Sequence, residues 1–199
     1  MNVVGLVDAG GANLGSVRYA LERLGANVRI VRDAWQLADC DRIVLPGVGA
    51  AAPAMALLRE RGMDAALRVT ALPLLGICLG MQLLFEYSEE GGVACLGRLP
   101  GRVQRMASSD GARVPHMGWN RLRHERPSAL TAGIADGEQA YFVHAYAVPV
   151  GEGCISSCGH GTRFAAVVGQ GATWGVQFHP ERSATAGARV LSNFLAMSS

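Results

Sequence analysis

Residues 72–86 limit the fold of this chain more than any other segment. An apolar run at 72–75 leads into Gly-Ile-Cys-Leu-Gly at 76–80, and a helix-forming sequence follows. Glycine on both sides of one Cys, between a strand and a helix, is typical of a nucleophile elbow with Cys in place of Ser. The turn is so sharp that a Cβ at either glycine would collide with backbone. The motif alone leaves two interpretations open for Cys78, the nucleophile of such an elbow or a buried Cys in an ordinary strand–helix unit.

Strand and helix patterns alternate regularly over the first 90 residues. Continuous apolar runs predict short strands that are buried on both faces, as in a parallel sheet. Apolar residues at helical spacing predict the helices between them. The expected strands lie at 3–7, 27–31, 41–45 and 72–75, with helices at 14–24 and 53–71, a break at Gly62, and a short helix or irregular link at 33–39. This alternation predicts an α/β fold, a flavodoxin-like three-layer sandwich with a mainly parallel central sheet.

After residue 90 the pattern changes to short β-prone pieces separated by turn residues. Such pieces predict antiparallel or mixed strands that are added to the parallel core. They lie at 102–106, 113–114, 140–148, 154–157, 164–168 and 173–178, and a last helix is expected at 184–196. Because neither a repeat nor a linker divides the chain, residues 1–199 are expected to form a single domain.

Composition sets bounds on the class of protein. Of the 199 residues, 50% are hydrophobic and 17% are charged, and the net charge is only +2. This balance argues against nucleic acid as a partner. No apolar run is long enough to span a membrane, and the first eight residues lack the basic start of a signal peptide. Five cysteines without a framework spacing indicate reduced thiols. We therefore expect a soluble cytoplasmic protein without a membrane partner.

Two other patterns carry little weight. Cys154, Cys158 and His160 have side chains that can bind metals, but no fourth ligand stands nearby in the sequence. Gly10 and Gly11 lack the spacing of a phosphate-binding loop. The sequence therefore predicts no metal site and no cofactor.

A histidine and a carboxylate stand together near the end of the chain. His179 follows the expected strand at 173–178, and Pro180 favours an extended backbone at His179. In an extended segment, residues two apart project on the same side, so Glu181 could reach the His179 ring. The carboxylate would fix the ring tautomer and leave the other nitrogen to accept the Cys78 proton. We predict Cys78, His179 and Glu181 as nucleophile, base and orienting group. The alternative is a strand-end His beside a solvated Glu.

The sequence Pro-Gly-Val-Gly at 46–49 offers a way to stabilise negative charge. It follows an expected strand, and its two glycines let the backbone present N–H groups inward. Together with the N–H of Leu79, which follows the nucleophile, the backbone at Val48 and Gly49 is predicted to form an oxyanion hole. An ordinary Pro-Gly turn is the alternative.

These motifs resemble those of the class I, or triad, glutamine amidotransferases. More narrowly, the chain is similar to the glutaminase subunits of imidazole glycerol phosphate synthases, which act in histidine biosynthesis. The narrower resemblance rests on Asn-Leu at 13–14, Ser-Val at 16–17, Pro-Gly-Val-Gly at 46–49, Pro-His-Met-Gly-Trp-Asn at 115–120, Tyr-Phe-Val-His-Ala-Tyr at 141–146 and His-Pro-Glu-Arg-Ser at 179–183. It covers nearly the whole chain, and the motifs at 115–120 and 141–144 are the most discriminating.

The resemblance implies a class I glutamine amidotransferase-like fold and a defined reaction. Cys78 would attack the side-chain amide of glutamine, release ammonia and form a γ-glutamyl thioester that water hydrolyses to glutamate. The substrate-binding positions that the resemblance implies are Gly47, Gln82, Ala145 and Tyr146, with Gly49 also contacting the substrate.

The resemblance also implies a partner. The ammonia would pass through a tunnel into a cyclase subunit with a TIM-barrel fold, which forms a heterodimer with the glutaminase and makes imidazole glycerol phosphate and AICAR. Asn13, Trp119, Tyr141 and Arg182 match positions that face the cyclase in this family. His116 and His144 are expected to position other groups, not to transfer protons.

Two places depart from the family's pattern. The loop at 8–13 lacks the Tyr-Gly-Met-Gly that many relatives carry before Asn13, and Ala145 stands where Ser or Thr is common. Three alternatives stay open: the same chemistry serving another synthase, a non-catalytic amidotransferase-like subunit, and a Cys peptidase or γ-glutamyl hydrolase on the same scaffold. The motif at 115–120 argues against the first, and the intact Cys, His and Glu argue against the second.

Overall fold

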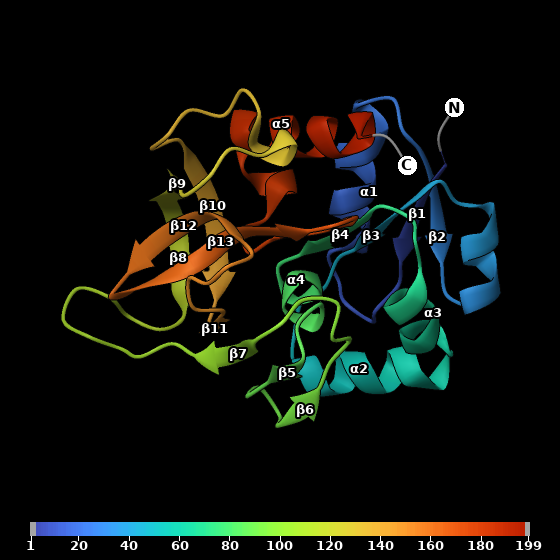
Figure 1. Ribbon diagram of the computed structural model, residues 1–199, viewed down its shortest axis with the longest axis horizontal. Helices are drawn as coiled ribbons and strands as arrows, with labels where there is room; N and C mark the ends of the chain where they lie inside the picture. The colour runs from blue at the N-terminus through green and yellow to red at the C-terminus, as the bar shows by residue number, and fades with distance from the viewer. Residues whose placement is uncertain (1–2, 198–199) are drawn as a thin grey trace.

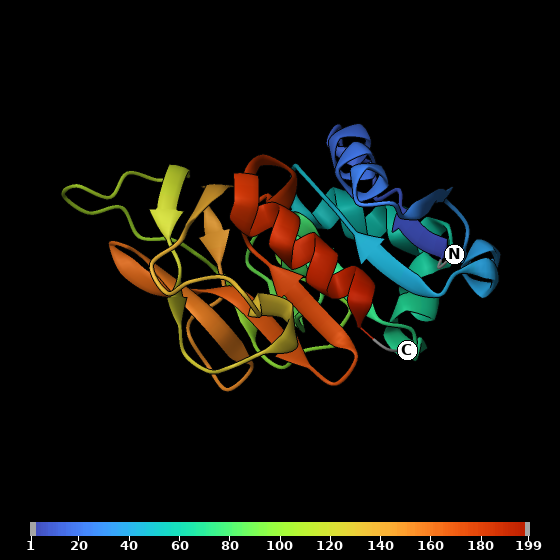
Figure 2. The same cartoon turned by 90° about the horizontal axis from the view of Figure 1, so that it is seen from above.

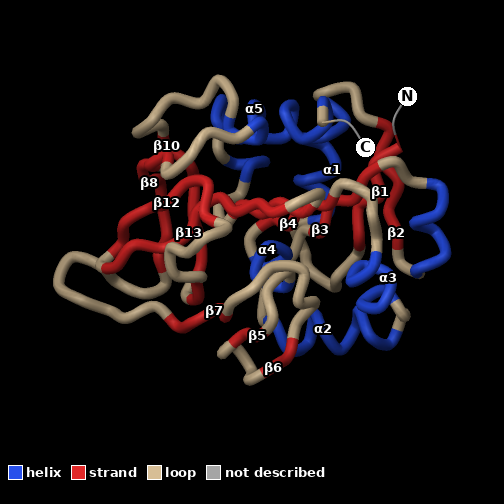
Figure 3. The backbone as a smooth tube through the Cα atoms, viewed as in Figure 1, coloured by secondary structure: helices blue, strands red, loops and turns tan. Residues whose placement is uncertain are grey.

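The structure, a computed structural model, describes residues 3–197. Within them the largest sheet has eight strands in the order β2-β1-β3-β4-β14-β13-β12-β9. The strands from β2 to β14 are parallel, and β13, β12 and β9 continue the sheet with antiparallel pairing. Helices α1 and α5 cover one face of the sheet, and α2, α3 and α4 cover the other (Figures 1 and 3). This arrangement confirms the predicted three-layer α/β fold with added antiparallel strands.

The elements of the parallel core agree with the predicted positions. The strands are β1 (Val3–Val7), β2 (Asn27–Val31), β3 (Arg42–Leu45), β4 (Leu74–Ile77) and β14 (Thr173–Val176). The helices are α1 (Leu14–Arg23), α2 (Ala51–Glu60), α3 (Met63–Val69), α4 (Leu79–Leu83) and α5 (Ala184–Ala196), with short 3-10 helices η1 (Ala34–Asp39), η2 (Ala129–Thr131) and η3 (Pro180–Arg182). The predicted break at Gly62 is confirmed, because this residue separates α2 from α3 with a φ of 63°.

Successive residues of the central strands pack on opposite faces of the sheet. Val4 and Leu6 of β1 belong to the core under α1 and α5, whereas Val7 belongs to the core that contains α2 and α3 residues. Figure 2 shows α5 lying across the sheet from above. Because both faces are covered, the strands read as continuous apolar runs, and the loops at their carboxyl ends are held by a rigid layer.

The second half of the chain differs more from the prediction. It contains β5 (Tyr87–Ser88), β6 (Val93–Ala94), β7 (Arg102–Arg105), β8 (His116–Arg121), β9 (Arg123–His124), β10 (Gln139–His144), β11 (Tyr146–Ala147), β12 (Cys154–His160) and β13 (Thr162–Gln170). The strand expected at 113–114 is wrong, and β8 was not predicted because His, Gly, Asn and Arg give it a weak β-propensity. It exists because β10 pairs with it along its whole length.

The piece expected as one strand at 140–148 is two strands. Its first part, β10, pairs with β8, and its second part, β11, pairs with β7. Ala145 lies between them and belongs to neither strand. At Ala145 the chain changes its pairing partner from β8 to β7, so the strand pairing is interrupted there.

The glycines on both sides of Cys78 are required by close backbone contacts. A Cβ on Gly80 would lie 1.7 Å from the carbonyl oxygen of Leu45, and a Cβ on Gly76 would lie 2.6 Å from the backbone nitrogen of Met81. Both contacts are with backbone atoms, which cannot rotate away. The steric reason that the sequence gives for these glycines is therefore confirmed.

Replacing Gly80 with Ala is expected to lower the free energy of unfolding by about 3 kcal/mol or more, because β3 and α4 must move apart. Gly15 provides a matched control, because it is exposed in α1 and a Cβ there meets no atom within 4 Å. Gly15→Ala should be neutral or stabilise the protein by about 0.5–1 kcal/mol. Urea unfolding of the two variants measures both effects, and equal unfolding midpoints would contradict the prediction.

Candidate active site

Three side chains that are distant in sequence meet at the carboxyl end of the parallel strands. Cys78 has a strained backbone with φ 53° and ψ −111°, as a sharp elbow requires. Nδ1 of His179 donates a hydrogen bond to Oε1 of Glu181 at 2.8 Å, and His179 and Cys78 line the same cavity. The side chains of His179 and Glu181 are only 7% and 1% exposed. The structure thus brings together the predicted nucleophile, base and orienting carboxylate.

The backbone around His179 is anchored to strand β10. The N–H of His179 donates to the carbonyl of Tyr141 at 2.9 Å. The hydroxyl of Ser183 donates to the His179 carbonyl at 2.7 Å and accepts the N–H of Tyr141 at 2.9 Å. These three hydrogen bonds fix the backbone of His179 and connect it to β10.

The geometric argument for the contact between His179 and Glu181 is wrong in one respect. His179 is extended, with φ −95° and ψ 98°, but Pro180, Glu181 and Arg182 form the 3-10 helix η3. A helical turn, not an extended segment, therefore places Glu181 against the ring. Gly187 allows this turn, because a Cβ there would lie 1.9 Å from the Pro180 carbonyl oxygen.

The electrostatics of the site favour a charged imidazole. Burial by itself lowers the pKa of His179, but hydrogen bonds and charge interactions with Cys78 and Glu181 raise it to about 10. Burial raises the pKa of Glu181, while His179 and a hydrogen bond from Asn13 together hold it below its usual value. Both shifts favour a His179 imidazolium paired with the Glu181 carboxylate.

The stability that His179 contributes is expected to fall as the pH rises. Its pKa is about 10 in the folded chain and 6.5 as the ordinary value. The bound proton therefore favours folding below pH 6.5, and this contribution disappears as the pH rises through 10. Urea unfolding across this range should show the stability difference between the wild type and His179→Asn shrinking. A difference that stays constant would contradict the raised pKa.

Cys78 and His179 open into a cavity of about 160 Å³. Its lining contains the predicted oxyanion residues and three of the four predicted substrate residues, namely Val48, Gly49, Leu79, Gln82, Ala145 and Tyr146. Gly47 does not line it. A Cβ on Gly47 would lie 3.1 Å from the Leu79 Cβ, so this glycine lets the loop at 46–49 pack against the elbow.

The first loop of the chain reaches the predicted oxyanion loop. A Cβ on Gly11 would lie 3.0 Å from the backbone nitrogen of Val48 and 3.3 Å from its carbonyl oxygen. The departure from the family pattern at 8–13 therefore lies against the peptide that is predicted to stabilise negative charge, and not only at a docking surface.

Two residues that the sequence analysis does not identify belong to the site. Glu90 lines the cavity, accepts the N–H of Ala51 at 3.0 Å, and has a pKa raised by burial. Gln177 is fully buried, and its Nε2 donates to the Cys78 sulfur at 3.7 Å. Gln177 stands two residues before His179 in the segment that follows β14, and this spacing is a signal that could have found it. Glu90 lies in a polar loop without such a signal.

The four residues predicted to face a partner divide into two groups. Trp119 and Tyr141 make an edge-on contact with ring centroids 5.8 Å apart, and Cζ of Arg182 lies 4.7 Å from the Tyr141 ring centroid. Trp119 is 49% exposed and its neighbour Met117 is 64% exposed. We call Met117, Trp119, Tyr141 and Arg182 the aromatic patch. Three of them are predicted partner residues, and the structure adds Met117.

Asn13 contacts two residues of the triad. Its Nδ2 donates to Oε1 of Glu181 at 2.5 Å and lies 3.3 Å from Nδ1 of His179. Because the His179 nitrogen donates its own proton to Glu181, the carboxylate is the acceptor for both groups. Asn13 therefore helps to fix the carboxylate that orients the imidazole.

Comparison with known proteins agrees with this geometry. Residues 5–197 match the family model for glutamine amidotransferase class-I. The chain is 60% identical over 198 residues to the imidazole glycerol phosphate synthase subunit HisH of Xanthomonas oryzae pv. oryzae (strain MAFF 311018), covering 100% of this chain and 99% of that protein. The chain belongs to the HisH family of class I glutamine amidotransferases.

A second relative and a solved structure agree with this membership. The amidotransferase is 58% identical over 197 residues to the HisH subunit of Xylella fastidiosa (strain Temecula1), covering 99% of this chain and 98% of that one. It also resembles a solved structure described as a glutamine amidotransferase, with a TM-score of 0.76, 26% identity and 96% of each chain covered. The predicted family and fold class are confirmed.

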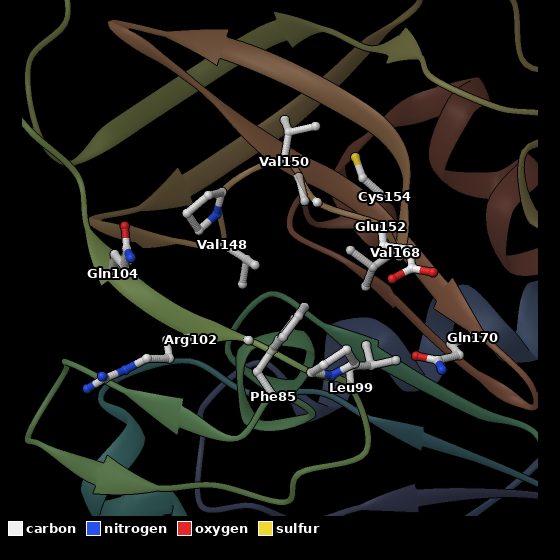
Figure 4. A pocket seen from close by; sticks show the side chains of 16 residues that line it. Phe85, Leu99, Arg102, Gln104, Val148, Val150, Glu152, Cys154, Val168 and Gln170 are labelled. Carbon is white, nitrogen blue, oxygen red and sulfur yellow. The ribbon is translucent and has the colours of Figure 1, made fainter.

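A different cavity of about 270 Å³ lies away from the triad of this amidotransferase (Figure 4). Phe85, Leu99 and Val148 form part of its apolar lining, and Arg102 and Glu152 also line it. Its lining shares no residue with the predicted active site. Cys154 also lines this cavity, but burial raises the pKa of its thiol to about 11, so it is not an activated nucleophile.

The other cysteines of the amidotransferase are buried free thiols. Burial raises the pKa of Cys154 to about 11 and that of Cys158 to about 12, which disfavours the thiolate that a metal or a substrate would need. Among residues 3–197, no group of three or more His, Cys, Asp or Glu is placed to hold a metal ion. In the same range, no helix has the length and apolar character needed to cross a membrane.

Proposed function

We propose that the chain hydrolyses the side-chain amide of glutamine at Cys78 and supplies the ammonia to a cyclase subunit that makes imidazole glycerol phosphate and AICAR in histidine biosynthesis. The observation that carries this proposal is that Cys78 and His179 line one cavity of about 160 Å³, while His179 is hydrogen-bonded to Glu181. Membership of the HisH family supports the reaction and the acceptor.

The first half of the reaction forms a thioester. The Cys78 sulfur attacks the carboxamide carbon of glutamine, and the oxygen of that group becomes negatively charged. The N–H of Leu79 and a peptide at Val48 or Gly49 stabilise this charge from the cavity wall. The imidazolium of His179 then gives its Nε2 proton to the leaving nitrogen, the C–N bond breaks, and ammonia departs.

The second half returns the enzyme to its starting state. Neutral His179 takes a proton from a water molecule, which attacks the thioester carbonyl. The C–S bond breaks, glutamate leaves, and Cys78 again faces a protonated His179. Glu181 stays hydrogen-bonded to Nδ1 in both halves, so Nε2 is the nitrogen that exchanges protons.

The cavity also contains groups that fit the amino-acid end of glutamine. Glu90 is a carboxylate in the lining and suits the α-ammonium group. Ala145, between β10 and β11, and Tyr146, the first residue of β11, present backbone where the chain changes its pairing partner. The absence of a Ser or Thr hydroxyl at Ala145 should matter little if this contact is made by backbone.

We place the docking site for the cyclase, in a heterodimer in the cytoplasm, at the aromatic patch. Met117, Trp119 and Arg182 are exposed and Tyr141 is half-buried, and the backbone of Tyr141 is hydrogen-bonded to His179. A partner bound to the patch would therefore contact β10, the strand whose Tyr141 backbone is hydrogen-bonded to His179. A TIM-barrel cyclase and an ammonia tunnel are the finer parts of this proposal, and they rest on the family resemblance.

Reconstitution tests the proposal. We expect the isolated chain to be a poor glutaminase and the complex with its cyclase to be at least about tenfold faster, because the peptides at Val48 and Gly49 must be oriented for the oxyanion. Glutamate release is measured with the chain alone, with the cyclase, and with the cyclase plus its nucleotide substrate. Full activity in the lone chain would contradict the gating. Copurification with a different synthase would contradict the acceptor.

A further inference from the structure

Two buried histidines next to the active site take no part in the proposed reaction. His116 on β8 and His144 at the end of β10 are direct neighbours in the register of the two strands. They are 3% and 6% exposed. Nδ1 of His116 lies 3.1 Å from Nε2 of His144, and His144 lines the cavity that contains Cys78.

The contacts of this pair allow one assignment of its protons. Nδ1 of His144 lies 2.9 Å from the carbonyl oxygen of Tyr146, which can only accept, so this nitrogen carries a proton. In a neutral ring Nε2 of His144 is then an acceptor. Nδ1 of His116 must therefore be the donor in the contact between the two rings, and Nε2 of His116 must be an acceptor.

Asn120 extends this series of hydrogen bonds, with donors and acceptors in the same order. Its Oδ1 accepts the N–H of Arg121 at 2.8 Å, so the other atom of the amide is the nitrogen. This Nδ2 donates to the Gly159 carbonyl at 2.9 Å and lies 3.2 Å from Nε2 of His116. The hydrogen bonds thus run from Asn120 through both rings to Tyr146. Protonating either ring would make two donors face each other.

A second series of hydrogen bonds connects the Tyr146 carbonyl with the Cys78 sulfur. Nε2 of Gln82 donates to the Tyr146 carbonyl at 2.8 Å and to Oε1 of Gln177 at 3.0 Å. Nε2 of Gln177 in turn donates to the Cys78 sulfur at 3.7 Å. The Tyr146 carbonyl therefore accepts hydrogen bonds from both His144 and Gln82. Its position affects the cavity wall and, through Gln82 and Gln177, the contacts of the Cys78 sulfur.

The surroundings of the rings oppose a positive charge. The ring of His116 stacks between Phe142, at 4.9 Å, and His160, at 4.1 Å. Burial, followed by the charge of His160, lowers the pKa of His116 to about 4; burial is also the largest cause that lowers the pKa of His144, to about 3. The titratable groups that act on the pair are His160 and His179, both of which oppose its protonation.

We propose that His116 and His144 are positioning residues, held neutral in the Nδ1–H tautomer, whose hydrogen bonds fix the Tyr146 carbonyl and so the glutamine-binding wall of the site. Asn120, next to Trp119 of the aromatic patch in the sequence, begins this series of hydrogen bonds. The effect on glutamine binding rests on the proposed function, whereas the tautomers do not.

Nitrogen NMR of the histidine-labelled chain tests the tautomers directly. Both rings should be neutral and protonated at Nδ1 from the ordinary histidine pKa of 6.5 upward, with no titration near it. Resonances are assigned with His116→Asn and His144→Asn. An Nε2–H tautomer, or a titration of either ring near the ordinary value, would overturn the proposal whether or not the chain hydrolyses glutamine.

Kinetics of two matched variants in the complex test the positioning role. His116→Phe keeps the aromatic stacking but removes the donor to His144, whereas His116→Asn keeps an N–H near the Nδ1 position. The KM for glutamine should rise about tenfold in His116→Phe, with a smaller change in kcat, and should return toward the wild type in His116→Asn. Equal KM values in the wild type and His116→Phe, or equal losses in both variants, would overturn the positioning role. A wild type without glutaminase activity would instead overturn the proposed function.

Discussion

Replacing Cys78 with Ala is expected to abolish glutamine-dependent synthesis by the complex while leaving ammonium-dependent synthesis by the cyclase intact. The sulfur forms the bond that replaces the C–N bond, and the methyl group of Ala cannot form it. We expect glutamate release to fall by about 10⁴-fold or more, toward the residual level that binding and oxyanion groups supply. Product formation is measured with glutamine and, separately, with ammonium salts.

The ammonium arm is the control for this variant. Cys78 is 6% exposed and is not part of the aromatic patch, so docking should survive the loss of one sulfur atom. Equal product formation from ammonium in the wild-type and variant preparations would show that the cyclase is equally active in both. Undiminished glutamine use by the variant would eliminate Cys78 as the nucleophile.

Replacing His179 with Asn is expected to lower kcat by about 10⁴- to 10⁶-fold, because Asn can neither hold a charge beside the sulfur nor carry a proton. The residues should act as a unit, so the double variant with Cys78→Ala should be no slower than the single ones. Glu181→Gln should cost less, about 10³- to 10⁴-fold, because the imidazole remains but loses its oriented tautomer. Single-turnover glutamate release measures this series.

The order of these effects is the sharper part of that prediction. Asn13 and His179 both donate to Oε1 of Glu181, at 2.5 and 2.8 Å, and the amide oxygen in Glu181→Gln could keep one of these contacts. If Glu181→Gln were as slow as His179→Asn, Glu181 would do more than orient the ring. If His179→Asn kept more than about one hundredth of the wild-type kcat, another group would be the base.

The parts of the fold that the sequence predicts are those with local causes. The parallel core follows from continuous apolar runs, and the elbow follows from two glycines that sterics require at 76 and 80. Strand β8 could not be predicted, because its residues form a strand only through pairing with β10. The split of the 140–148 segment at Ala145 likewise depends on two partners that are distant in sequence.

The candidate site shows the same division. Cys78, His179 and Glu181 carry motif signals, and the structure brings them together, although a 3-10 turn and not an extended segment places Glu181. The resemblance implies that Asn13 faces a partner, which stays a prediction, and its hydrogen bond to the Glu181 carboxylate is visible only in the folded structure. Contacts that join residues far apart in the chain, such as Gln177 with Cys78 and His116 with His144, required the folded structure.

Active-site labelling tests the central claim most directly. A glutamine analogue with a diazoketone in place of the amide is incubated with the complex, and the labelled peptide is identified by mass spectrometry. The predicted result is one label per chain, on Cys78, blocked by glutamine and accompanied by loss of glutamine-dependent but not ammonium-dependent synthesis. A label on another residue, or full glutamine-dependent synthesis after Cys78 is labelled, would contradict the account.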